Sequence, residues 1–220
     1  MSQSPLLSPA EADVSDRHGR ILNAAERCFV RTGFHRTTMQ DVAAEAGMSP
    51  GNLYRYFPSK DAIVIAITER DRARIGDDFS AFEAGEDFLP FFRRMAQKYF
   101  ADEPREKSVL CLEIWAEAAR TSAFSAITQA FEGDINGRLT ALFRQAQSSG
   151  AMAATADPQA LAYLVSVLAD GLFVRRAIGA TFDPEREVGT IMAVIDAAFA
   201  GHIHLGPPAS QLSPRDDVDA

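Results

Sequence analysis

Apolar residues recur at helical spacing through almost the whole chain between residues 15 and 205. Near the start, Ile21, Ala25, Cys28 and Phe29 follow one another at i, i+4, i+7 and i+8, which places them on one helical face. Gly33 comes next and suits the left-handed conformation that ends many helices. We find no alternating β-branched run bounded by a tight turn, so strands are not predicted. The pattern predicts an all-α fold.

Two short helices are predicted directly after this first one. The first of them ends at Gly47, and the second begins after Ser49, which can cap it, with Pro50 at its first position. A proline there costs nothing, because the first N–H groups of a helix have no partner within it. Leu53 and Phe57 then share the inner face of the second helix. Two short helices joined by a tight turn have the spacing of a helix–turn–helix, whose second helix enters a major groove of DNA.

Longer helices are predicted from residue 59 onward. The expected segments are 59–74, one helix carrying Phe88 to Tyr99, one carrying Leu110 to Trp115, one carrying Ile135 to Ala146, then 158–178 and 184–202. Residues 1–14 and 206–220 are rich in Ser, Pro, Ala or Asp without periodicity, so both are expected to be disordered tails. We therefore predict a helix–turn–helix domain over 15–60 and a larger helical domain over 61–205.

The composition is that of a globular protein, and its charge is unevenly distributed. The chain has 220 residues, 47% of them hydrophobic and 24% charged, with two cysteines and no apolar run close to the roughly 20 residues that span a bilayer. This predicts a protein of the reducing cytoplasm without membrane association. The formal net charge is −8, yet residues 16–60 hold seven basic and four acidic side chains, whereas residues 76–220 hold twelve basic and twenty-one acidic ones. A modestly basic module followed by an acidic body suggests an anionic partner for the module.

The chemistry of the predicted helix–turn–helix suits double-stranded DNA. Hydroxyl and ammonium groups near helix starts can contact phosphates, small residues at a helix N-terminus allow close approach, and amide or aromatic side chains can contact base edges. The candidate DNA-binding residues are Thr38, Gln40, Ser49, Gly51, Asn52, Tyr54, Arg55, Tyr56 and Lys60. Taken singly, each of these can instead be a helix cap, a solvated charge or a half-buried core residue.

Residues 17–67 resemble the DNA-binding domain of the TetR/AcrR-type transcriptional regulators. The matching motifs are Ile-Leu-Asn-Ala-Ala from residue 21, Gly-Phe before Thr-Thr at 33–38, Asp-Val-Ala at 41–43, Gly-Asn-Leu-Tyr-Arg-Tyr-Phe at 51–57, and Ser-Lys at 59–60. The resemblance implies a homodimer with one helix–turn–helix per protomer, bound to a palindromic operator and released by a small-molecule inducer. It assigns phosphate contacts to Thr38, Ser49, Tyr54 and Lys60, and base contacts to Gln40, Gly51, Asn52 and Tyr56. Pro50 stands where many members carry a basic residue.

The last two predicted helices are candidates for the dimer interface. Residues 158–178 are apolar almost all round, and such a helix must be buried on two sides. One side belongs to the protein's own core, and a partner subunit is the natural second, so that two helices from each chain would pack together. The alternative is a helix buried wholly inside a monomer.

Aromatic and polar residues of the larger domain are candidates for lining an inducer pocket. The candidates are Phe88, Phe92, Met95, Tyr99, Cys111, Trp115, Phe131, Asp170 and Phe173, although each can equally be a core residue. Glu113 and Glu117 lie on the same predicted helix as Trp115. They could bind a cationic ligand, but a solvated helix face is the favoured interpretation. Asp170 lies in an apolar helix and needs a partner, either across a dimer or in the pocket.

Other chemistry is not predicted. His202 and His204 have no cysteine or carboxylate cluster beside them, and no hydrolase elbow or phosphate-binding loop occurs, so we expect no metal, cofactor or catalytic residues. Cys28 and Cys111 are expected to be buried free thiols.

The function predicted is a ligand-responsive repressor whose inducer is lipophilic or cationic. The alternatives are an all-helical enzyme or carrier with a non-functional helix–turn–helix, and an activator or architectural DNA-binding protein.

Overall fold

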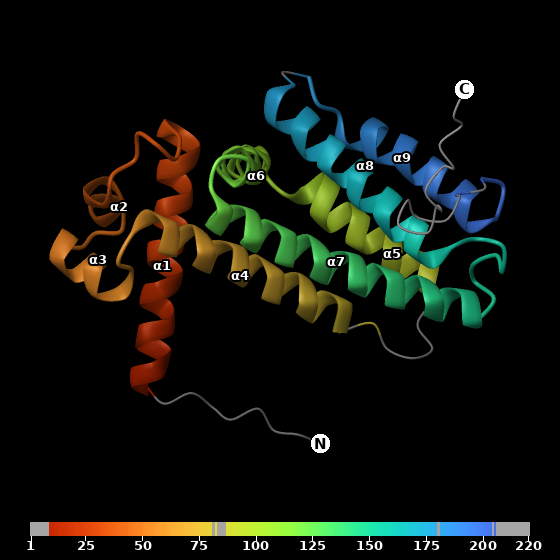
Figure 1. The fold of residues 1–220 in the computed structure, drawn as a ribbon, viewed down its shortest axis with the longest axis horizontal. Helices are drawn as coiled ribbons and strands as arrows, with labels where there is room; N and C mark the ends of the chain where they lie inside the picture. Colours follow the sequence, from red (N-terminus) through yellow and green to blue (C-terminus); the bar gives the residue numbers. More distant parts are fainter. Residues whose placement is uncertain (1–8, 81, 83–86, 180, 204, 206–220) are drawn as a thin grey trace, which may run out of the picture. The chain divides into compact units, whose positions relative to one another are not determined.

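The computed structural model describes residues 9–80, 82, 87–179, 181–203 and 205, and every regular element in these ranges is a helix (Figure 1). The helices are α1 (Pro9–Thr32), α2 (Met39–Glu45), α3 (Pro50–Tyr56), α4 (Lys60–Ser80), α5 (Phe88–Ala96), the π-helical segment η1 (Gln97–Asp102), α6 (Arg105–Ala118), α7 (Ser122–Ser148), α8 (Pro158–Ile178) and α9 (Pro184–Phe199). The all-α prediction is confirmed. The tails predicted at 1–8 and 206–220 lie outside the described residues, but α1 begins at Pro9, so the prediction that residues 9–14 are disordered is wrong.

The chain divides into two compact units, at positions that differ from the predicted boundary. The first unit comprises the residues up to Asp71 together with Val109–Thr128, and the second comprises Arg72–Ser108 and the residues from Gln129 onward. Helices α4, α6 and α7 therefore each contribute residues to both units. The reason is that side chains of α6 and α7 complete the core around the short helices, as described below.

The core of the first unit is built by one face of each of its helices. Ile21 and Phe29 of α1, Val42 of α2, Leu53 of α3 and Ile63 of α4 are all at most 1% exposed. Helix α2 packs on α1, and α3 packs on α2 (Figure 1). The inward positions are those that the helical spacing predicts. Leu110 of α6 and Phe124 of α7 join the same core, although they follow the start of α4 by 50 and 64 residues.

The core of the second unit is centred on four phenylalanine rings. Phe143 of α7 is fully buried and lies 5.6 Å from the ring of Phe92, 6.0 Å from Phe88 and 5.3 Å from Phe199, measured between ring centroids. All three pairs have the edge-to-face geometry that aromatic quadrupoles favour. Helices α8 and α9 lie side by side in this unit and supply Leu161, Ile195 and other aliphatic residues to the same cluster (Figure 1).

The two cysteines differ in burial. Cys28 is a buried free thiol, as predicted, and burial raises its pKa above the ordinary value. Cys111 is likewise a thiol rather than half of a disulfide, but it is only partly buried, so the prediction of burial is wrong for this residue. Across the part of the chain that the structure describes, no helix combines the length and apolarity needed to span a lipid bilayer.

Candidate nucleic-acid interface

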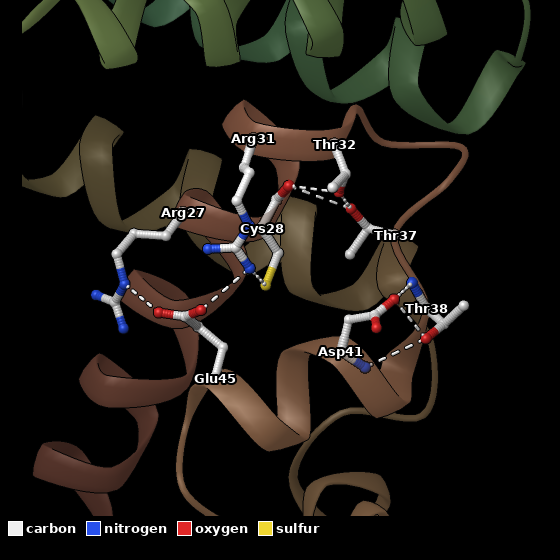
Figure 2. A network of polar contacts seen from close by, with 8 residues as sticks. All are labelled: Arg27, Cys28, Arg31, Thr32, Thr37, Thr38, Asp41 and Glu45. Atoms are coloured by element: carbon white, nitrogen blue, oxygen red, sulfur yellow. Dashed lines mark hydrogen bonds and ion pairs between the residues drawn. The ribbon is translucent and has the colours of Figure 1, made fainter.

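The N-terminus of α2 is closed by a reciprocal pair of side-chain hydrogen bonds. The backbone N–H of Asp41 donates to the Thr38 hydroxyl at 3.2 Å, while the backbone N–H and hydroxyl of Thr38 donate to the Asp41 carboxylate at 2.8 and 2.7 Å (Figure 2). This capping box satisfies helix N–H groups that would otherwise lack partners. The hydroxyl and backbone donors of Thr38 lower the pKa of Asp41. Thr38 itself remains exposed, as a phosphate contact requires.

Ion pairs attach the other end of α2 to α1. Glu45 accepts from Arg27 Nε at 2.7 Å and from Arg31 Nη2 at 3.1 Å, and both arginines lie on α1 (Figure 2). Hydrogen bonds from Arg27 and then Arg31 lower the pKa of the Glu45 carboxyl group. Since exposed ion pairs contribute little to stability, their main effect is to orient α2 and to neutralise an acid on a unit expected to meet DNA.

The tight turn between α2 and α3 depends on Gly47. Gly47 has φ +68°, a conformation that residues with a Cβ rarely adopt, and the N–H of Met48 closes the turn on the carbonyl of Ala43 at 2.9 Å. Ser49 then caps α3, since its hydroxyl accepts from the N–H of Asn52 at 3.3 Å, and Pro50 occupies the first helical position. The capping prediction for Ser49 is confirmed.

Helix α3 divides into a buried and an exposed side. Leu53 is 0% and Phe57 is 5% exposed, whereas Tyr54 is 54% exposed. A Cβ added to Gly51 would find no atom within 4 Å, so the start of this helix is open to an approaching partner. Of the predicted DNA-binding residues, six are exposed (Thr38, Gln40, Ser49, Gly51, Tyr54 and Arg55), and Asn52, Tyr56 and Lys60 are partly buried.

Two of the partly buried residues make contacts that the sequence did not indicate. The hydroxyl of Tyr56 accepts from Arg17 Nη1 at 3.5 Å, and its ring lies 5.5 Å from that of His18, so α1 supports the end of α3. The ammonium of Lys60 donates to the carbonyls of Phe34 at 2.7 Å and His35 at 3.3 Å. A lysine ammonium has three donors, and two of them are used on this loop.

Glu113 and Glu117 have a role that both sequence interpretations missed. Glu113 Oε2 accepts from the backbone N–H of Phe34 at 2.8 Å, and Glu117 Oε1 lies 2.6 Å from His35 Nε2. Glu117 is only 5% exposed, so the expectation of a solvated face is wrong. Helical spacing placed the two acids on one face of α6, but no local pattern could show that this face meets a loop about 80 residues earlier in the chain.

The predicted inducer-binding residues are divided between the two units. Phe88, Phe92 and Met95 belong to the packed aromatic core of the second unit, and Phe173 lies 6.0 Å from the ring of Phe100. Tyr99 donates to the carboxylate of Asp78, and its pKa is raised, first by burial and then by that hydrogen bond. The remaining members are Cys111 and Trp115, which belong to the first unit, and Phe131 and Asp170, which belong to the second.

Asp170 lies on the exposed face of α8 rather than in the core. Desolvation by its surroundings, followed by the nearby Glu132 carboxylate, raises the pKa of Asp170 to about 6. The large exposed apolar side chains Tyr163, Val167, Val174 and Ile178 lie on the same face, at intervals of three or four residues from Asp170 or from each other. The acid is therefore set in an apolar helix face that, in the described chain, lies against solvent.

Comparisons with known proteins agree with this geometry. Residues 21–67 match the family described as bacterial regulatory proteins of the tetR family, and residues 92–200 match the C-terminal domain of BetI-type transcriptional repressors. The transcriptional regulator RutR of Escherichia coli is 31% identical over 160 residues, which are 69% of this chain and 71% of RutR.

Solved structures share the fold of this chain. Salmonella enterica GusR superposes with a TM-score of 0.71 at 27% identity, over 89% of this chain and 99% of GusR. A Saccharomonospora viridis protein solved in complex with choline has a TM-score of 0.71 at 20% identity, over 83% of this chain and 96% of that protein. The chain therefore belongs to the TetR family of bacterial transcriptional regulators.

Proposed function

We propose that this protein represses transcription by binding a palindromic operator as a homodimer, with α3 of each protomer in a major groove, until a small ligand releases it. The observation that carries the proposal is the division of α3: Leu53 and Phe57 anchor the helix, while Tyr54, Arg55 and the open start at Gly51 remain available. Exposed aromatic, cationic and small residues along one short helix suit base edges and phosphates. Two such helices would stand about 34–36 Å apart, one turn of DNA.

The proposed dimer uses α8 and α9. Tyr163 and Ile178 on α8 are 67% and 73% exposed, and Val194 on α9 is 41% exposed, which gives these two helices an apolar outer face. A second copy of the chain is the natural cover for such a face, and a two-fold arrangement matches a palindromic operator. Replacing Ile178 with Asp should shift the protein to monomer in sedimentation velocity and should weaken operator binding with it.

The proposed inducer is lipophilic or cationic and binds among residues of the C-terminal domain. The aromatic content of the second unit supports a lipophilic ligand, and the choline complex of the Saccharomonospora viridis protein supports a cationic one. Native mass spectrometry of the purified protein would identify a retained ligand. Thermal-shift assays with choline and with a long-chain fatty acid would separate the two classes, since a ligand that binds only the folded state raises the melting temperature.

The DNA proposal is tested by fluorescence anisotropy with duplexes from the gene's own upstream region at several salt concentrations. Arg55→Ala should weaken binding to the preferred duplex at least tenfold, whereas Arg144→Ala, which removes an exposed arginine from α7, should change it less than threefold. If the two variants weaken binding equally, Arg55 contributes only its charge and makes no specific contact with the DNA. No preference of the wild-type protein for any upstream duplex over a scrambled one would overturn the proposed function.

A further inference from the structure

The loop between α1 and α2 is held by helix α6, whose residue Glu113 follows Phe34 of the loop by 79 residues. Gly33 ends α1 with φ +82°, and a Cβ at this position would lie 3.5 Å from Glu113 Oε2. The next N–H, that of Phe34, donates to the same Glu113 oxygen at 2.8 Å. A hydrogen bond to a charged acceptor is about twice as strong as one between neutral groups. The carboxylate of Glu113 is thus a specific anchor for the start of the loop.

A second carboxylate and a lysine hold the rest of the loop. Glu117, one helical turn after Glu113, pairs with His35 Nε2 at 2.6 Å and with Arg120 Nη1 at 3.2 Å. From α4, the ammonium of Lys60 donates to the carbonyls of Phe34 and His35 and lies 4.5 Å from the centroid of the Phe34 ring. The loop is therefore held by two helices. Helix α6 binds the N–H of Phe34 and the side chain of His35, and α4 binds the carbonyls of both residues.

This loop leads directly into the N-terminus of α2. Thr37 is 1% exposed, and its hydroxyl lies 2.7 Å from the Thr32 hydroxyl (Figure 2). The same hydroxyl donates to the carbonyl of Gly33 at 2.8 Å. Thr38, the next residue, is the N-cap of α2 and a predicted phosphate contact. Only His35 and Arg36 separate Phe34 from this buried threonine, and neither is a glycine, so we expect a displacement of Phe34 to move Thr38 as well.

From these contacts we infer that Glu113 is a positioning residue for DNA recognition. Its carboxylate fixes the loop that presents Thr38 and α2 to the operator, and the inference rests on the proposed function. Electrostatics alone would predict the opposite, because an anionic side chain in a DNA-binding unit repels phosphates, so that its removal should tighten binding. The two explanations therefore predict changes of opposite sign.

The test compares three variants of the full-length protein by operator anisotropy, at a temperature well below their melting transitions. Glu113→Ala removes the acceptor and should weaken operator binding about tenfold, the effect of losing one hydrogen bond to a charged group. Glu113→Gln keeps an oxygen acceptor but removes the charge, and should bind within threefold of wild type. Glu106→Ala removes an exposed charge from the first turn of α6 and should bind equally or slightly more tightly.

A second readout makes the result independent of DNA. Hydrogen exchange at the Phe34 amide, followed by NMR, should be at least tenfold faster in Glu113→Ala than in wild type, and close to wild type in Glu113→Gln. Unchanged exchange, or operator binding by Glu113→Ala that equals that of Glu106→Ala, would overturn the inference. If wild type itself fails to prefer the operator, the proposed function is wrong; the exchange data then still report whether Glu113 holds the loop.

Discussion

Replacement of Gly51 by alanine should affect stability and DNA binding in opposite directions. Gly51 is the second residue of α3, it is exposed, and an added Cβ would meet no atom within 4 Å. Alanine in a helix is favoured over glycine by about 0.5–1 kcal/mol, because glycine loses more conformational entropy on folding. For a chain of this length that gain raises the melting temperature by about 1–4 °C.

Gly47→Ala is the matched control for this change. Its added Cβ also meets nothing within 4 Å, but the φ of +68° costs an alanine about 1–2 kcal/mol. The same substitution four residues earlier in the chain should therefore lower the melting temperature. Thermal unfolding followed by circular dichroism at one protein concentration would measure both shifts, and shifts of the same sign would contradict this account of the turn.

The DNA effect of Gly51→Ala follows from the predicted approach of α3 to the bases. A methyl group at the open start of the helix would hold the backbone away from the groove, and a lost base contact is worth about 1–3 kcal/mol, or at least about fivefold in affinity. Anisotropy with the preferred duplex would measure it. A more stable variant that binds as tightly as wild type would refute the assignment of Gly51 to the interface.

Three further predictions concern stability and pH. Phe143→Ala should lower the free energy of unfolding, measured in urea, by about 3–5 kcal/mol, because the fully buried ring contacts three other phenylalanines. Thr38→Ala should cost about 1 kcal/mol through loss of the capping box and weaken operator binding without changing its salt dependence, since no charge is removed. The folded-state pKa of Asp170, about 6, lies above the ordinary 3.8, so the folded state takes up a proton as pH falls through 6 and gains stability relative to the unfolded chain. Asp170→Asn should therefore be more stable than wild type at pH 7.5, and urea titrations at pH 7.5 and 5 should show that advantage shrinking at the lower pH.

Helix boundaries were predictable where capping residues mark them. Helix α8 spans Pro158–Ile178 as predicted, because Asp157 caps it through the N–H groups of Gln159 and Ala160 and Gly179 follows its last turn. Helix α9 begins at Pro184 for the same reason, with Asp183 as its cap. Where no such residue occurs, the boundaries moved. Helix α4 continues to Ser80 rather than ending near residue 74, because no proline follows Arg74 before Ser80 and a single glycine, Gly76, weakens a helix without ending it.

The site was predictable in its local part and not in its long-range part. The caps at Thr38 and Ser49 and the turn at Gly47 depend on residues within a few positions of one another, which a sequence pattern contains. The contacts of Glu113 and Lys60 with the loop after Gly33 depend on packing between distant segments. Aromatic residues predicted to line a pocket were ambiguous for a related reason: ring size and apolarity are the same whether a phenylalanine fills a core or faces a ligand.

The division of the chain also changes what its charge distribution implies for DNA binding. Residues 16–60 alone are formally positive, but the first unit also contains the start of α1, part of α4 and residues of α6 and α7. Residues 1–71 and 109–128 together hold nine basic and eleven acidic side chains, so the unit is formally negative. The net charge of the unit therefore does not by itself favour binding to phosphates.

Several acidic side chains of the first unit are paired with neighbouring groups, which reduces their repulsion of DNA phosphates. Glu45 is neutralised by Arg27 and Arg31, Asp41 is engaged at the N-terminus of α2, and Glu117 is paired with His35. These acids are engaged by neighbouring groups of the unit, whereas Arg55 is exposed on α3 beside the open helix start. Affinity then depends on a few well-placed donors rather than on net charge. This is why a carboxylate such as Glu113, which holds the loop in place, can favour DNA binding despite its sign.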